Sequence, residues 1–169
     1  MHGNLRRTGF LGVTFFAWFV ILALGALTAC PKFVSQDKRT GSDGRSKGAR
    51  SVFIENGEGK TKGIVTYPGG DRVDWKSVTL PEDQVGTLSM KLTWRSPREG
   101  LALGFDVFDQ YGKLIVTQKG GKKKRRLSRS RSADIESAKG KYLIRVYAPF
   151  RGDAGKYTLR VAFAVRIRR

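Results

Sequence analysis

The residue types that most often perform catalysis are scarce in this sequence of 169 residues. It has one cysteine, Cys30, and one histidine, His2, and both lie within the first 30 positions. General acid–base catalysis at neutral pH most often uses histidine, and the common zinc sites need cysteine or histidine. The chain after Cys30 contains neither, and no Ser–Lys or paired-carboxylate motif stands out. We therefore expect a protein that is not an enzyme, with no catalytic residue and no metal site.

Four aspartates leave one alternative for a bound ion. Asp71, Asp74, Asp106 and Asp109 lie near the ends of segments with strand patterns, and clustered oxygen ligands bind calcium. Their positions also have an explanation without a ligand, because Asp71 and Asp109 suit turns and Asp106 would point outward between two apolar neighbours. We therefore expect no cofactor, with calcium as the alternative.

The most unusual stretch is a basic run at 119–131. Between residues 110 and 133 there are nine basic residues and no acidic one. Like charges repel, so the run predicts an extended, solvated loop. Its basic residues are Lys119, Lys122, Lys123, Lys124, Arg125, Arg126, Arg129 and Arg131. The functional interpretation is docking on a polyanion; the alternative is an insertion that only adds solubility.

The charge of the chain as a whole points the same way. Thirty-one of the 33 basic residues and all 14 acidic residues follow Cys30, which gives that part a net charge of +17. Such an excess favours polyanionic neighbours, such as nucleic acid, anionic lipid headgroups or acidic polysaccharide.

The first 30 residues have the pattern of a secretory signal. Arg6 and Arg7 precede an uncharged run, Phe10 to Leu27, and small residues follow it. A basic start, an apolar stretch and small residues before a cut define such signals. The run is also just long enough to span a bilayer, so an uncleaved signal anchor is the alternative. In either case the rest of the chain would face away from the cytoplasm, and we expect no nucleic-acid partner.

The tetrapeptide Leu27-Thr28-Ala29-Cys30 resembles the lipobox of bacterial lipoproteins. This resemblance implies that residues 1–29 are removed, that Cys30 carries the lipid, palmitate included, and that acyl chains anchor the protein to a membrane of the cell envelope. Several acyl chains give stable anchoring where one would be marginal. Pro31, rather than Asp, follows the cysteine, which by the same resemblance favours the outer membrane.

A polar segment follows the lipid-accepting cysteine. Residues 30–50 are rich in Gly and Ser, mixed in charge and almost free of apolar residues after Val34. Such a segment buries too little apolar surface to offset the entropy of ordering. We expect a disordered tether between the membrane and a domain at 51–169.

From Ser51 onward the apolar residues recur with a period of two. The clearest segment is the last, where one face is formed by Tyr157, Leu159, Val161, Phe163, Val165 and Ile167. A repeat of two places alternate side chains on opposite sides of a strand. Similar patterns run over 88–94, 103–107 and 142–146, with Gly- and Pro-containing turns between them. The sequence predicts an all-β protein, an antiparallel β-sandwich of jelly-roll type.

The order of these segments resembles the bacterial pre-peptidase C-terminal (PPC) domain. Five motifs carry the resemblance: Gly63-Ile64-Val65, Asp74-Trp75, Leu103 to Asp109, Gly140 to Val146, and Gly155 to Leu159. It implies a small β-sandwich that is itself not catalytic and accompanies secreted enzymes. This chain departs from the pattern by its basic insertion and by carrying no attached enzyme.

Together these features predict a non-catalytic lipoprotein of the cell envelope whose sandwich is a binding module. The expected partners are the membrane, through the lipid anchor, and an acidic polysaccharide, lipopolysaccharide or envelope protein. Two alternatives remain open: a structural or assembly subunit that pairs through its sheet edges, and a hydrolase with a Ser- or carboxylate-based site.

Overall fold

The computed structural model describes residues 39–97, 101–119 and 128–166. The contacts within the chain separate residues 1–33 from 34–169, and the expected signal and lipidation site at 1–30 lie outside the described residues. Within the described ranges, no helix is long and apolar enough to span a membrane.

The described chain is built almost entirely of strands. Two short 3-10 turns come first, η1 (Ser42–Gly44) and η2 (Ser46–Gly48). The strands that follow are β1 (Arg50–Ser51), β2 (Glu58–Thr66), β3 (Val73–Thr79), β4 (Gly86–Arg95), β5 (Gly104–Asp109), β6 (Leu114–Gln118), β7 (Ser130–Ala138), β8 (Lys141–Tyr147) and β9 (Ala154–Val165).

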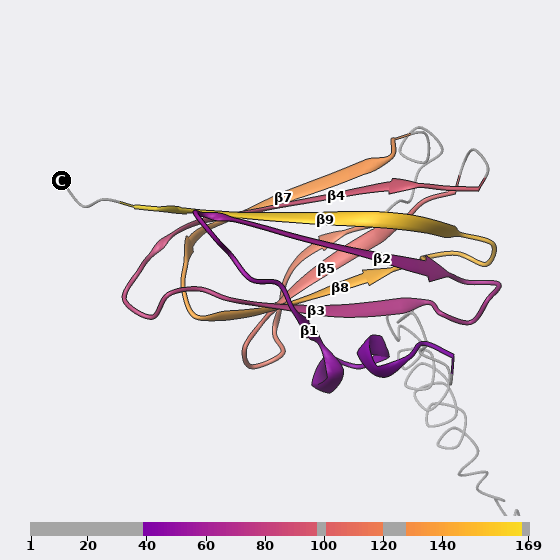
Figure 1. The fold of residues 1–169 in the computed structure, drawn as a ribbon, viewed down its shortest axis with the longest axis horizontal. Coiled ribbons are helices and arrows are strands. Elements are labelled where there is room, and N and C mark those ends of the chain that lie inside the picture. Colours follow the sequence, from indigo (N-terminus) through magenta and orange to yellow (C-terminus); the bar gives the residue numbers. More distant parts are fainter. Residues whose placement is uncertain (1–38, 98–100, 120–127, 167–169) are drawn as a thin grey trace, which may run out of the picture. The chain divides into compact units, whose positions relative to one another are not determined.

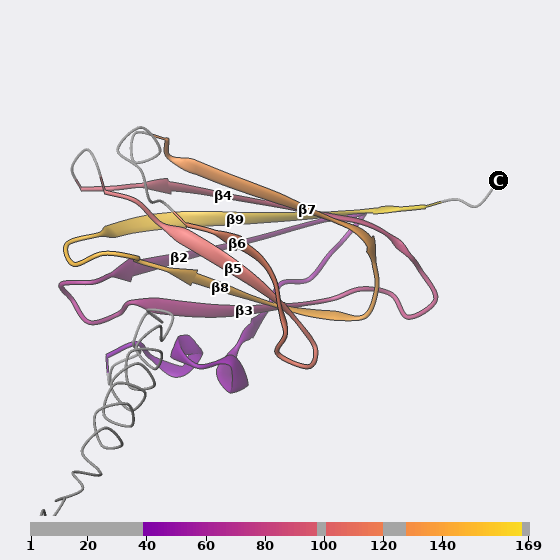
Figure 2. The ribbon, with the colours of Figure 1, turned by 180° about the vertical axis from the view of Figure 1, so that it is seen from behind.

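These strands form two sheets, ordered β1-β3-β8-β5-β6 and β2-β9-β4-β7. The two layers lie face to face (Figures 1 and 2). All pairs are antiparallel except β1 with β3. The predicted antiparallel β-sandwich is therefore confirmed.

The core fills the space between the two sheets. The longest strand, β9, alternates as predicted: Tyr157, Leu159, Val161 and Phe163 are buried and face β3, β8 and β5. Burying each large apolar side chain contributes roughly 1.5–3 kcal/mol. Val165, which we placed on the same face, is half exposed because β9 runs past the end of the sandwich.

A second, smaller apolar cluster covers the outer face of the five-stranded sheet. Val73, Trp75 and Tyr147 are buried there, and Ala49, Phe108 and Leu143 pack against them. Trp75 and Phe108 have ring centroids 5.2 Å apart. The five-stranded sheet therefore buries side chains on both of its faces.

The predicted tether is wrong for the part that the structure describes. Residues 39–50 fold onto the sandwich: β1 extends the five-stranded sheet, and Asp43 is buried. The low apolar content predicted a tether, but polar contacts hold the segment on the sandwich. Thr40 donates to the carbonyl of Gly70 at 3.4 Å, and Asp43 accepts from Lys76.

Candidate functional site

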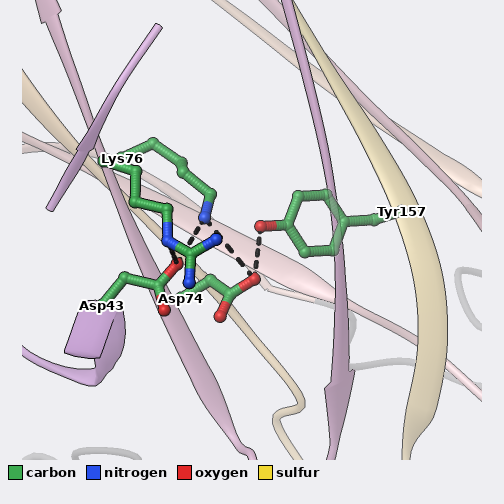
Figure 3. Close-up of polar contacts among 5 residues, drawn as sticks. Asp43, Asp74, Lys76 and Tyr157 are labelled. Atoms are coloured by element: carbon green, nitrogen blue, oxygen red, sulfur yellow. Dashed lines mark hydrogen bonds and ion pairs between the residues drawn. The ribbon is translucent and has the colours of Figure 1, made fainter. Parts of the chain in front are cut away.

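A group of charged side chains lies inside the sandwich, beside the strands β2 and β3. Asp74 and Lys76 of β3 share the inward face with Val78, and the side chain of Lys76 is 2% exposed. Its ammonium lies 2.6 Å from Oδ2 of Asp43 and 3.7 Å from Oδ2 of Asp74 (Figure 3). Buried charges need such partners, because an isolated one is strongly destabilising. Asp43 of η1 thus neutralises a lysine that the core could not otherwise hold.

The opposite sheet contributes the fourth member of this cluster. The hydroxyl of Tyr157 in β9 donates to Oδ2 of Asp74 at 2.5 Å (Figure 3). Burial raises the pKa of Asp74 above its ordinary value, although Tyr157 and Lys76 oppose the rise. Burial and the nearby Asp74 also raise the pKa of the Tyr157 hydroxyl. Gly63 of β2 leaves room for this contact, since a Cβ there would collide with both partners.

A second polar group lies on the outer face of the five-stranded sheet. Asp106 of β5 accepts from Arg145 at 2.5 Å, from Tyr147 at 3.2 Å and from Thr117. The guanidinium of Arg145 lies over the rings of Trp75, Phe108 and Tyr147. Burial and the Asp106 carboxylate raise the pKa of the Tyr147 hydroxyl. Asp106 points away from the core as predicted, but it is buried by the side chains that donate hydrogen bonds to it.

The four aspartates that could have formed a calcium site do not converge. Asp74 faces the interior, whereas Asp106 lies on the opposite face of the sheet. Asp109 accepts from the backbone N–H groups of Tyr111 and Lys113 and so shapes the β5–β6 turn. In the described ranges, no three Cys, His, Asp or Glu side chains gather as metal ligands would.

The basic run is described only at its two ends. Lys119 and Arg129 are exposed, whereas the expected ligand contacts of Lys122, Lys123, Lys124, Arg125 and Arg126 lie outside the described residues. Arg131 does not belong to the exposed set. It lies in β7, is 8% exposed and places its guanidinium 5.2 Å from the ring centroid of Trp94. Strand alternation turns it inward, where an aromatic face stabilises the cation.

Most aromatic side chains of the described residues are buried and so are not available to stack against a sugar. Trp94 is 4% exposed and donates its Nε1–H to the carbonyl of Leu101 at 3.3 Å. Phe150 is 40% exposed and Tyr111 is 86% exposed. They lie in different turns, so they do not extend a stacking surface.

The outer face of the four-stranded sheet carries the described surface best suited to a ligand. Two open hollows of about 640 and 740 Å³ lie on it, and Lys60 lines both. Six exposed cations of β2, β4 and β9 line them: Lys60, Lys62, Lys91, Arg95, Lys156 and Arg160. This surface is called the cationic face below. It can bind anions. The hydroxyls of Ser89 and Ser132, which line the first hollow, can add hydrogen bonds.

Sequence reasoning missed both the buried cluster and the cationic face. The buried cluster left a signal: Asp74, Lys76 and Val78 are in phase, so two opposite charges share a strand face with a core residue. The cationic face depends on which strands become neighbours, since its members are separated by up to 100 positions. A single sequence does not show which strands pair with each other.

No protein-family model and no curated protein matches the sequence. Among solved structures, the pre-peptidase C-terminal domain of a collagenase from Bacillus anthracis is similar at 16% identity and a TM-score of 0.49. The similarity covers 67% of this chain and 93% of that domain. A structure described as "CBM4 structure and function" is similar at 13% identity and a TM-score of 0.28, over 66% and 72% of the two chains.

The first of these structures belongs to the family that the sequence motifs resemble. Its TM-score is just below 0.5, and membership of this chain in that family stays a prediction. The β-sandwich itself follows from the strand pairing and from the core between the two sheets.

Proposed function

We propose that this protein is a non-catalytic lipoprotein of the cell envelope whose β-sandwich docks on an envelope polyanion. Cys30 carries the lipid anchor, and the outer membrane is the favoured location. The basic side chains of the domain supply the attraction. The domain resembles a PPC module in its motifs.

The distribution of charge between interior and surface is the observation that carries the proposal. Among the described residues, four acidic side chains are buried, namely Asp43, Asp74, Asp106 and Asp153, but only two basic ones, Lys76 and Arg131. Asp153, for example, accepts from the backbone N–H groups of Ala102 and Phe150. Folding therefore withdraws more negative than positive charge from a chain that already has a large basic excess.

The interior clusters also support a non-catalytic role. The carboxylates of Asp74 and Asp106 accept hydrogen bonds from side chains of their own fold, and both residues are nearly inaccessible to solvent. A hydrolase would need a carboxylate or serine that a substrate can reach. These buried groups join strands and the N-terminal segment instead.

The test is retention of the full chain, purified in detergent, on resins that carry an acidic polysaccharide, lipopolysaccharide or a neutral polysaccharide. At low salt the proposal predicts retention on the two anionic resins and none on the neutral one. Equal retention on all three, or none on any, would contradict it.

One observation favours a second candidate function, assembly with a protein partner. The edge strand β6 leaves Leu114 and Ile115 half exposed, and Tyr111 protrudes from the preceding turn. Exposed edge strands can pair with a strand of another protein. A defined stoichiometric complex that Ile115→Lys abolishes would support assembly as the function, and binding of purified polyanion alone would not.

A further inference from the structure

The cationic face has a row of three positive charges on neighbouring strands. In the pairing register Arg160 of β9 lies opposite Lys60 of β2 on one side and opposite Lys91 of β4 on the other. Neighbouring strands are about 4.8 Å apart, so the three backbone positions span roughly 10 Å. All three side chains are exposed and lie on the face opposite to the core.

This row is unfavourable for the isolated fold. Like charges directly opposite each other on paired strands are destabilising. Among the described residues, none of the three cations forms an ion pair; the ion pairs of Arg50, Lys76 and Arg145 lie on the five-stranded sheet. Glu58 and Asp134 line the same hollow without pairing with them. The sheet thus concentrates positive charge that an external anion can neutralise.

Lys60 lines both hollows, so the two lie next to each other along the strands, and together they are called the trough below. The first hollow is lined by the row with Ser89 and Ser132. The second is lined by Lys62, Arg95 and Lys156. Lys156 and Arg160 are four residues apart on β9, which is about 13 Å along a strand. Cations therefore extend from the row to the far end of the trough, at Arg95 and Lys156.

We propose that this trough binds a single chain of a linear acidic polysaccharide, with Lys60, Lys91 and Arg160 as its principal anion contacts. The inference rests on the proposed function and assigns its ligand class and its site. The two hollows follow one another along the strands, so a single polymer chain can lie across both. The hydroxyls of Ser89 and Ser132 lie where sugar hydroxyls can bond to them.

The acidic residues at one end give the trough a direction. Glu58 and Asp134 lie on the row next to the three cations, opposite Ala162 and Ser89. Carboxylates repel an anionic group but accept hydrogen bonds from neutral sugar hydroxyls. The acidic groups of the polysaccharide are therefore directed from the row toward Lys62, Lys156 and Arg95.

The experiment compares two triple variants of the full chain, each with three positive charges fewer. The first is K60S/K91S/R160S on the trough, and the control is K113S/K139S/K141S, at three exposed lysines outside both the trough and the basic run. The probe is a polygalacturonate oligomer, titrated at low salt, with vesicles containing phosphatidylglycerol as the second probe. We expect the trough variant to bind the oligomer at least 10-fold more weakly and the control to stay within about 2-fold of the wild type.

Thermal unfolding separates loss of the site from loss of the fold. Removing a row of like charges should leave the trough variant at least as stable as the wild type, and the oligomer should raise the unfolding temperature of the wild type and the control only. Should the triple variant fail to fold, Lys60→Glu on the edge strand β2 provides the same test with one substitution.

Two results would overturn this inference but leave polyanion docking intact. One is full binding of the oligomer by the trough variant, which would place the site elsewhere, for example in the basic run. The other is binding to anionic vesicles that exceeds both binding to neutral vesicles, where only the lipid anchor acts, and binding to the oligomer; this would make an anionic membrane surface the ligand. Absence of binding by the wild type to either probe would contradict the proposed function as well.

Discussion

The ammonium of Lys76 lies 2.6 Å from Oδ2 of Asp43, although 33 positions separate the two residues in the sequence. Both side chains are more than 90% buried. The contact fixes the segment before β1 to the side of the sandwich, so the domain begins before Ser51, where the sequence pattern placed its start. Removal of Asp43 leaves the buried ammonium of Lys76 with only the longer contact to Asp74 at 3.7 Å.

Replacement of Asp43 by Ala should therefore destabilise the fold. Loss of one partner of a buried ion pair costs about 3–5 kcal/mol, and the remaining contact of Lys76 with Asp74 places the expected value at the low end. Urea unfolding of the full chain measures it. Arg50→Ala is the control, since this arginine also pairs with Asp43 but is 67% exposed, and its loss should cost less than about 1 kcal/mol. Equal effects of the two substitutions would contradict the account.

Gly63→Ala should disrupt the contact between the sheets. The added Cβ would collide with the Tyr157 hydroxyl and with Oδ2 of Asp74, which are already hydrogen-bonded. Overpacking of this kind typically costs about 1–3 kcal/mol. Lys62→Ala, at the exposed neighbouring position, should change stability by about 0.5 kcal/mol or less. A Gly63→Ala variant as stable as this control would show that the space beside Gly63 is not restricted.

The raised pKa of Asp74 predicts a specific pH dependence. Because the folded state binds this proton more tightly than the unfolded chain does, Asp74 contributes most to stability below its ordinary pKa of 3.8. That contribution decreases as the pH rises through the folded pKa and is constant above it. The free energy of unfolding of the wild type should thus fall relative to that of Asp74→Asn as the pH rises from about 3. A difference that grows with pH would indicate a lowered pKa instead.

Asp106 should be needed to hold Arg145 over the aromatic rings. The carboxylate is 2% exposed and accepts from Arg145, Tyr147 and Thr117. Asp106→Ala should destabilise the protein by about 3–5 kcal/mol because it leaves a largely buried guanidinium without its partner. The double variant with Arg145→Met should recover part of this loss. Additive effects of the two substitutions would show that the pair is not coupled.

Cys30→Ser should abolish membrane anchoring, because a hydroxyl at this position does not replace the thiol that accepts the lipid. In a bacterial host the wild type should fractionate with the membrane and carry diacylglycerol, detected as a mass increase of the N-terminal peptide. The variant should lose both properties. Retention of the variant in the membrane fraction, with residues 1–29 still attached, would instead support an uncleaved signal anchor.

The strands were predictable because their burial alternates along the chain. Every second residue from Leu88 to Trp94, from Phe105 to Val107 and from Tyr157 to Phe163 faces the core, as the spacing predicts. Gly112, which ends the β5–β6 turn, has the positive φ of 82° that glycine tolerates best. These are local properties, and a single sequence contains them.

Features that depend on distant partners were not predictable in the same way. The low apolar content of residues 39–50 led to the prediction of a tether. An ion pair between Asp43 and Lys76 of β3 holds the segment instead. Arg131 looked like part of an exposed basic loop, but Trp94 of the neighbouring strand covers it. The cationic face needs the strand order β2-β9-β4, which brings Lys60, Arg160 and Lys91 together.

The salt dependence of binding is the sharpest test of docking through surface cations. The affinity of the full chain for an acidic polysaccharide would be measured between about 50 and 200 mM salt, where screening of exposed charges increases steeply. Docking through surface cations predicts that the logarithm of the binding constant falls linearly with the logarithm of salt concentration, as for other polyanions. Affinity that stays constant over this range, or equal affinity for a neutral polysaccharide, would contradict electrostatic docking.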